Sequence, residues 1–127
     1  MGRVVTLKEE APLSLVVEKI KQSLGLDHVQ VAPAAGSSSD PKIKTIAICA
    51  GSGGSVFRGV DADLFYTGEL SHHEALYFVE TGASVVACNH SNTERAFLKV
   101  LREQLLSELP DAEIDISTCD HDPYQTW

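Results

Sequence analysis

Apolar and polar positions follow two different periods along the chain. Residues 3–7 alternate like a strand, and residues 13–24 carry apolar side chains at nearly helical spacing. Residues 28–32 alternate again, with Val29 and Val31 expected to face inward. The chain is therefore predicted to open as β-α-β.

The remaining pattern is more regular. Strands are predicted over residues 43–49, 62–66, 83–88 and 113–117, and helices over residues 71–80 and 93–106. The longer helix carries an apolar stripe that we expect to be buried, formed by Ala96, Phe97, Val100, Leu101 and Leu105. Strands that alternate with helices predict a single α/β domain over residues 1–127. Its three layers, α/β/α, would contain a largely parallel sheet covered on both faces.

One segment interrupts this alternation. Residues 33–42 are small and polar and include Pro33 and Pro41. Such composition predicts a mobile loop. A domain boundary is not expected there, because too little chain precedes the segment to form a core of its own.

Composition narrows the classes of function. The 127 residues carry a formal net charge of −8, which argues against direct binding to nucleic acid or to anionic lipid. No apolar run approaches the roughly 18 residues of a membrane span, and the amino terminus lacks a signal-peptide core. Two of the three cysteines, Cys49 and Cys88, end apolar runs where small buried thiols are common. An odd number of cysteines fits a reducing intracellular compartment.

A glycine-rich segment follows the strand predicted at 43–49. Residues 51–55 read Gly-Ser-Gly-Gly-Ser, but Val56 stands where a dinucleotide-binding fingerprint has its third glycine. We interpret these glycines as a tight turn with close backbone packing. No nucleotide or nicotinamide cofactor is predicted.

The strongest candidate chemistry lies in residues 89–95. His90 and Glu94 follow an apolar strand directly, at a position where open α/β sheets bind ligands, and an imidazole with a carboxylate suits a divalent metal ion. A structural alternative is also open, because Ser91-x-x-Glu94 matches a capping box. In that case Glu94 would stabilise a helix start, and it would bind no metal.

Two further polar groups carry side chains that commonly bind metals. His72 and His73 follow the strand predicted at 62–66, and side chains of adjacent helical residues point about 100° apart, so at most one is expected to reach the crevice. Residues 120–123, Asp-His-Asp-Pro, contain ligand-like side chains but are predicted to be a solvated turn.

Three segments, residues 50–54, 62–69 and 89–95, together resemble the Nif-three-like family, also described as homologues of the type-two GTP cyclohydrolase one. The resemblance covers nearly the whole chain and is weakest in residues 33–42. It implies a three-layer α/β fold built from two intertwined halves around a dinuclear metal centre. This chain would correspond to the carboxyl-terminal half, as a truncated product or isoform.

The resemblance also implies roles for individual residues. His90 and Glu94 fall on the family's H-x-x-x-E metal ligands, and the family's T-G-[DE]-x-x-x-H motif falls on Thr67, Gly68, Glu69 and His73. His73 would face the metal pocket as a candidate catalytic residue, either a proton shuttle or a substrate contact. The remaining ligands, a His-His pair and an Asp, belong to the amino-terminal half, so the ligand set here is incomplete. Zn, Fe and Mn are not distinguished.

Two functions follow as expectations. In the full-length context the centre would serve a metal-dependent hydrolase acting on a nucleotide or another phosphorylated small molecule. The alternative is an adapter without catalysis, with a transcription-related protein partner, in the cytoplasm and nucleus. The helix from Thr93 and the tail Tyr124–Trp127 are candidate contact surfaces. Half of an intertwined fold would leave apolar surface uncovered, so we also expect a homo-oligomer.

Overall fold

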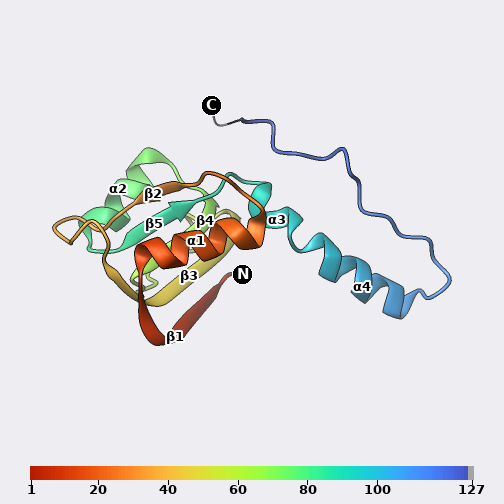
Figure 1. Ribbon diagram of the computed structural model, residues 1–127, viewed down its shortest axis with the longest axis horizontal. Coiled ribbons are helices and arrows are strands. Elements are labelled where there is room, and N and C mark those ends of the chain that lie inside the picture. The colour runs from red at the N-terminus through yellow and green to blue at the C-terminus, as the bar shows by residue number, and fades with distance from the viewer. Residues whose placement is uncertain (126–127) are drawn as a thin grey trace.

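The computed structural model describes residues 1–125, which form five strands and four helices (Figure 1). In chain order these are β1 (Arg3–Pro12), α1 (Leu13–Leu24), β2 (Gln30–Ala32), β3 (Lys42–Ser52), β4 (Leu64–Glu69), α2 (His72–Glu80), β5 (Ser84–Ala87), α3 (Asn92–Arg95) and α4 (Leu98–Glu108). The predicted order of elements is therefore confirmed as far as β5.

The five strands form one mixed sheet in the order β1-β3-β4-β5-β2. The three central strands are parallel, with Ile48 opposite Tyr66 and Tyr66 opposite Val86, whereas the edge strands β1 and β2 pair antiparallel. Parallel neighbours need a crossover. Residues 53–63 provide it between β3 and β4, and α2 provides it between β4 and β5. The α/β prediction is confirmed, with parallel pairing confined to the centre.

Alternating residues of the central strands build a core on each face of the sheet. Ile46, Leu64 and Val86 pack on one face with α1, while Ala47 and Phe65 pack on the other with α2. Helix α1 lies across the front of the sheet in Figure 1. The predicted three-layer arrangement is therefore confirmed.

Local signals set the ends of α1 and α2. Helix α1 follows Pro12 and ends at Gly25, whose φ of 67° is left-handed. At α2 the capping box forms, because the Ser71 amide donates to the Glu74 carboxylate at 2.9 Å and the Glu74 amide donates to the Ser71 hydroxyl at 3.3 Å.

The prediction that Val31 faces inward is wrong, since this residue of the edge strand β2 is 40% exposed.

The prediction of one continuous helix with a buried apolar stripe at residues 93–106 is wrong in both respects. The helix is divided into the short α3 and the separate α4, which projects away from the sheet (Figure 1). No residue of α4 is buried, and all five residues of the predicted stripe are exposed: Ala96, Phe97, Val100, Leu101 and Leu105. Residues 113–117 also form no strand. An apolar stripe becomes buried only against another surface, and α4 extends beyond the sheet that could supply one.

The loop at residues 33–42 is anchored near both ends. The Ala34 amide donates to the Ser84 hydroxyl at 3.1 Å, and the Ser14 amide and hydroxyl both donate to the Asp40 carboxylate at 2.8 Å. The latter contacts lower the pKa of Asp40, with the Ser14 amide as the main cause.

Within residues 1–125, each helix is too short or too polar to cross a membrane.

Candidate functional site

The ends of the three parallel strands meet the turn that follows β5. Gly51 lies near the end of β3, Glu69 is the last residue of β4, and His90 follows β5 closely. Asn89 has a φ of 66°, a left-handed conformation that bends the chain sharply before His90. Because parallel strands finish at the same edge of a sheet, these residues come together there.

The His90 imidazole lies between two carboxylates. Its Nδ1 atom is 2.8 Å from Oε1 of Glu69, a hydrogen bond, and its Nε2 atom is 3.5 Å from Oε1 of Glu94. All three side chains are about half exposed. Glu69 therefore occupies one ring nitrogen and leaves the other directed toward Glu94. The carboxylates approach opposite ring nitrogens, and the described residues contain no group of three or more His, Cys, Asp or Glu arranged to hold one ion.

The structural alternative for Glu94 is wrong. Ser91 has helical backbone angles and makes no capping hydrogen bond. Its hydroxyl instead accepts a hydrogen bond from Arg95 at 2.8 Å and donates to Asp122 at 3.0 Å. The Glu94 carboxylate is consequently free of the predicted capping box and faces His90.

Gly51 leaves open the space beside these two side chains. A Cβ atom at this position would lie 2.8 Å from Nε2 of His90 and 3.0 Å from Oε1 of Glu94, and the φ of 68° also favours glycine. Thr93 ties this glycine to the His90 turn, because its hydroxyl accepts from the Gly51 amide at 2.8 Å and donates to the His90 carbonyl at 2.7 Å. Sequence reasoning assigned no site role to Gly51 or Thr93, although both lie in the quoted motifs.

The environment of His90 favours its charged form. The hydrogen bond to Glu69 is the main cause of the raised pKa of His90; desolvation opposes it, and the negative charges of Glu69, Glu94 and Asp122 add to it. The ion pair with Glu69 therefore exists while the carboxylate is ionised and the imidazole is protonated, and it is lost as the pH rises through the raised pKa of His90. In neutral His90, an Nδ1 proton donated to Glu69 would leave the Nε2 lone pair available.

His73 lies elsewhere in this chain. It lines a cavity of about 370 Å³ with Arg58, Glu74 and Tyr77, and none of the residues lining this cavity belongs to the His90 turn. Its ring centroid is 5.5 Å from that of His72. Within the described residues, the structure joins Glu69, His90 and Glu94 but does not bring His73 to them.

The glycine-rich turn and the cysteines have structural roles. A Cβ atom on Gly53 would lie 2.5 Å from the Phe57 ring, and one on Gly54 would overlap the Glu74 carboxylate, so the close-packing interpretation is confirmed. Cys49 and Cys88 are buried as predicted. Burial raises the pKa of the Cys88 thiol to about 11, which keeps it protonated at neutral pH.

Residues 120–123, predicted to be a solvated turn, are mostly exposed, and two of their side chains also contact the turn around His90. Asp120 accepts a hydrogen bond from Nε of Arg95 at 2.8 Å, and Asp122 accepts the one from Ser91. This polar corner therefore lies against the His90 turn. In the tail predicted as a contact surface, Tyr124 is exposed, while residues 126 and 127 lie outside the described part of the chain.

Comparison with known proteins gives a consistent result. A family model described as Duf34/NIF3 (NGG1p interacting factor 3) matches residues 1–123. The human protein named NIF3-like protein 1 is 45% identical over 126 residues, covering 98% of this chain and 33% of its own length. NGG1-interacting factor 3 of Saccharomyces cerevisiae is 44% identical over 126 residues, covering 96% and 43%.

Solved structures agree on the fold. A Bacillus cereus protein related to NIF3 superposes with a TM-score of 0.78 at 25% identity, covering 100% of this chain and 36% of that one. A hypothetical protein of Staphylococcus aureus gives a TM-score of 0.76 at 28% identity, covering 100% and 43%. This chain thus spans about a third to under half of the length of these relatives, and its fold is one part of a larger one.

Proposed function

Because this chain belongs to the Duf34/NIF3 family, we propose that His90 and Glu94 contribute two ligands to a divalent metal centre. The 3.5 Å between Nε2 of His90 and Oε1 of Glu94 carries the proposal. Two ligand atoms about 2.05 Å from one tetrahedral ion are roughly 3.3 Å apart. Gly51 supports it, because the space beside both atoms is one that any larger residue would fill.

Glu69 supports the same proposal. Histidines that bind metal commonly donate their other ring N–H to a carboxylate, which fixes the tautomer and the ring orientation. The 2.8 Å contact between Glu69 and Nδ1 of His90 fits that role. Two ligands are too few for a catalytic ion, so the remainder must come from chain beyond this one or from a second copy.

We further propose that in the full-length context the centre belongs to a hydrolase acting on a nucleotide or another phosphorylated small molecule. A bound divalent ion would polarise a phosphoryl or carbonyl oxygen and lower the pKa of water. Of the two roles expected of His73, we propose the substrate contact, because the cavity that it lines contains no residue of the His90 turn and a proton shuttle would have to reach the ion. Arg58 lines the same cavity, and together the two side chains could bind an anionic group.

Metal uptake tests this proposal. Purified chain titrated with Zn²⁺ in a calorimeter is expected to bind at pH 7.5, and the double variant His90→Ala/Glu94→Ala is expected to lose at least 100-fold in affinity. Because the metal requires neutral imidazole, affinity should weaken as the pH falls through the raised pKa of His90. His28→Ala/Glu80→Ala removes an exposed pair of the same chemistry and should bind like the wild type. Equal affinity in all three proteins would contradict the assignment.

A second candidate function is protein interaction, as an adapter with a transcription-related partner in the cytoplasm and nucleus. Its support is the name of the yeast relative, NGG1-interacting factor 3, together with the exposed apolar side chains of α4. Contiguous exposed apolar surface is typical of contact sites. We propose that this surface also pairs copies of the chain into a homo-oligomer.

The oligomer is tested on α4 itself. Wild-type chain is expected to elute as a multiple of 13.7 kDa in size-exclusion chromatography with light scattering, and Leu101→Glu/Leu105→Glu is expected to elute as the monomer. The two substitutions place charge on exposed positions, so they should not unfold the sheet. A monomeric wild type, or an oligomer that survives both substitutions, would argue against this contact.

A further inference from the structure

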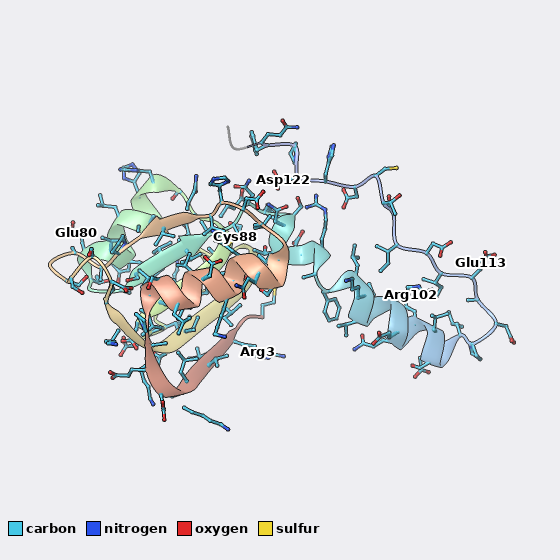
Figure 2. All side chains as sticks on the ribbon, viewed as in Figure 1. Arg3, Glu80, Cys88, Arg102, Glu113 and Asp122 are labelled. Carbon is cyan, nitrogen blue, oxygen red and sulfur yellow. The ribbon has the colours of Figure 1, made fainter. Side chains whose placement is uncertain are left out.

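The polar segment Asp120–Asp122 returns to the candidate site from the far end of the chain. After α4 the backbone runs back toward the body of the protein, and Asp122 lies near the turn that follows β5 (Figures 1 and 2). Asp120 contacts Arg95, which lies 25 positions earlier in the sequence, and Asp122 contacts Ser91, which lies 31 positions earlier. We call this set of contacts the clasp: Ser91, Arg95, Asp120 and Asp122.

Arg95 is the centre of the clasp. Its Nε donates to Asp120 at 2.8 Å, one terminal nitrogen donates to Ser91 at 2.8 Å and the other donates to Asn92 at 2.9 Å. The side chain is only 22% exposed. An isolated surface ion pair stabilises little, but a guanidinium that holds three partners at once fixes their relative geometry.

The clasp is anchored on the sheet as well. Asn92, which accepts from Arg95, donates its side-chain amide to the carbonyl of Cys88 at 2.9 Å, and Cys88 is buried directly after β5. The Ser91 hydroxyl donates to Asp122 at 3.0 Å. A continuous series of hydrogen bonds therefore runs from the sheet through the His90 turn to the carboxyl-terminal segment.

The clasp residues alternate with the candidate ligands. Ser91 follows His90 directly, and Arg95 follows Glu94 directly, so each of these two clasp residues is the covalent neighbour of a candidate ligand. Ser91 and Arg95 are four residues apart, as are His90 and Glu94. A shift of Ser91 relative to Arg95 would change the distance between the His90 imidazole and the Glu94 carboxylate. The negative charge of Asp122 also acts on His90.

We propose that Asp120 and Asp122 are positioning residues, which hold the turn at residues 89–95 through Arg95 and Ser91 and so set the spacing of His90 and Glu94. The consequence for metal binding rests on the proposed function, whereas the effect on the turn does not. Metal affinity would then depend on the segment Asp120–Asp122, which lies 25 to 31 residues after its contacts Arg95 and Ser91 in the sequence. Removing a direct hydrogen-bond partner of a metal ligand changes metal affinity by about 10- to 100-fold, and Asp120 and Asp122 act one contact further away, so we expect the lower end of that range.

The test compares two double variants in the whole chain. Asp120→Asn/Asp122→Asn weakens the clasp. Asp111→Asn/Asp115→Asn removes the same charge from the same segment, at two exposed carboxylates without side-chain hydrogen bonds in residues 1–125. A third variant, Asp120→Glu, keeps a carboxylate for Arg95 and serves as the rescue. Circular dichroism establishes that each variant is folded.

Two readouts are needed, one of them without metal. Amide hydrogen exchange at residues 89–95 is expected to accelerate in the clasp variant but not in the charge control. In a Co²⁺ titration the clasp variant is expected to lose about tenfold in affinity and to change the visible spectrum, which reports ligand geometry. Asp120→Glu should retain most of the protection and affinity of the wild type.

The outcomes separate the two proposals. Exchange in the clasp variant equal to that in the charge control overturns the positioning role. If exchange is faster in the clasp variant but its Co²⁺ affinity and spectrum equal those of the charge control, the clasp holds the turn without setting the spacing of His90 and Glu94, and that part of the proposal is overturned. If the wild-type chain binds no Co²⁺, the metal proposal has failed for this chain, and the exchange measurement alone decides whether the clasp holds the turn.

Discussion

Leu64→Ala is expected to lower the free energy of unfolding by about 2–5 kcal/mol, the usual loss for removing a large side chain from a packed core. Leu64 is fully buried, at 0% exposure, in the central strand β4. It packs with Val16 and Ile20 of α1 and with Ile46 and Val86 of the neighbouring strands. A cavity there would loosen the contact between the sheet and its covering helix.

Leu105→Ala provides the matched control. It removes the same atoms from α4, where the leucine is 39% exposed, and in chain diluted to the monomer it should change the free energy of unfolding by less than about 1 kcal/mol. Urea unfolding measures both values, with the slope of the transition checking that the compactness of the two end states is unchanged. Equal losses in the two variants would contradict the burial described for β4 and α4.

The elements predicted most accurately from the sequence have local signals at their ends. Pro12 and Gly25 delimit α1, and Ser71 with Glu74 starts α2, because each signal acts within one turn of helix. The strands of the sheet centre were also recognisable, since buried parallel strands carry continuous apolar runs. These elements needed no knowledge of their neighbours.

The region after β5 shows what periodicity cannot predict. An apolar stripe marks which face of a helix would be buried, but it does not reveal whether a surface is present to bury it. The stripe through Val100 and Leu101 is exposed, and the helix breaks between Arg95 and Leu98. The same limit applies to residues 113–117, because a strand needs a partner that this chain does not supply within residues 1–125.

The candidate site was predictable only in part. Spacing and family motifs identified His90 and Glu94, but whether Ser91 would cap a helix depended on competition for its hydroxyl. Arg95 and Asp122 take that hydroxyl, and Asp122 is 31 residues away. Contacts between distant segments decide such competition. A local motif such as the capping box therefore could not predict its outcome.

Gly51→Ala is expected to weaken metal binding at His90 and Glu94 by at least tenfold, although both proposed ligands remain. The added methyl group would lie 2.8 Å from Nε2 of His90 and 3.0 Å from Oε1 of Glu94, closer than van der Waals contact allows. Both side chains would have to move from the 3.5 Å spacing that suits a shared ion. The affinity is measured by Zn²⁺ calorimetry, as for the ligand variants.

Gly59→Ala isolates the effect of the methyl group from that of the backbone. Gly59 has a φ of 73°, close to the 68° of Gly51, but nothing lies within 4 Å of a Cβ atom added there. Both variants should therefore carry a similar left-handed strain of about 1–2 kcal/mol, while only Gly51→Ala fills the space beside the ligands. Zn²⁺ affinity is expected to fall in Gly51→Ala and to match the wild type in Gly59→Ala. Wild-type affinity in both variants would mean that the ion binds elsewhere. An equal fall in both would attribute the loss to backbone strain, because the two glycines differ mainly in what an added Cβ atom would contact.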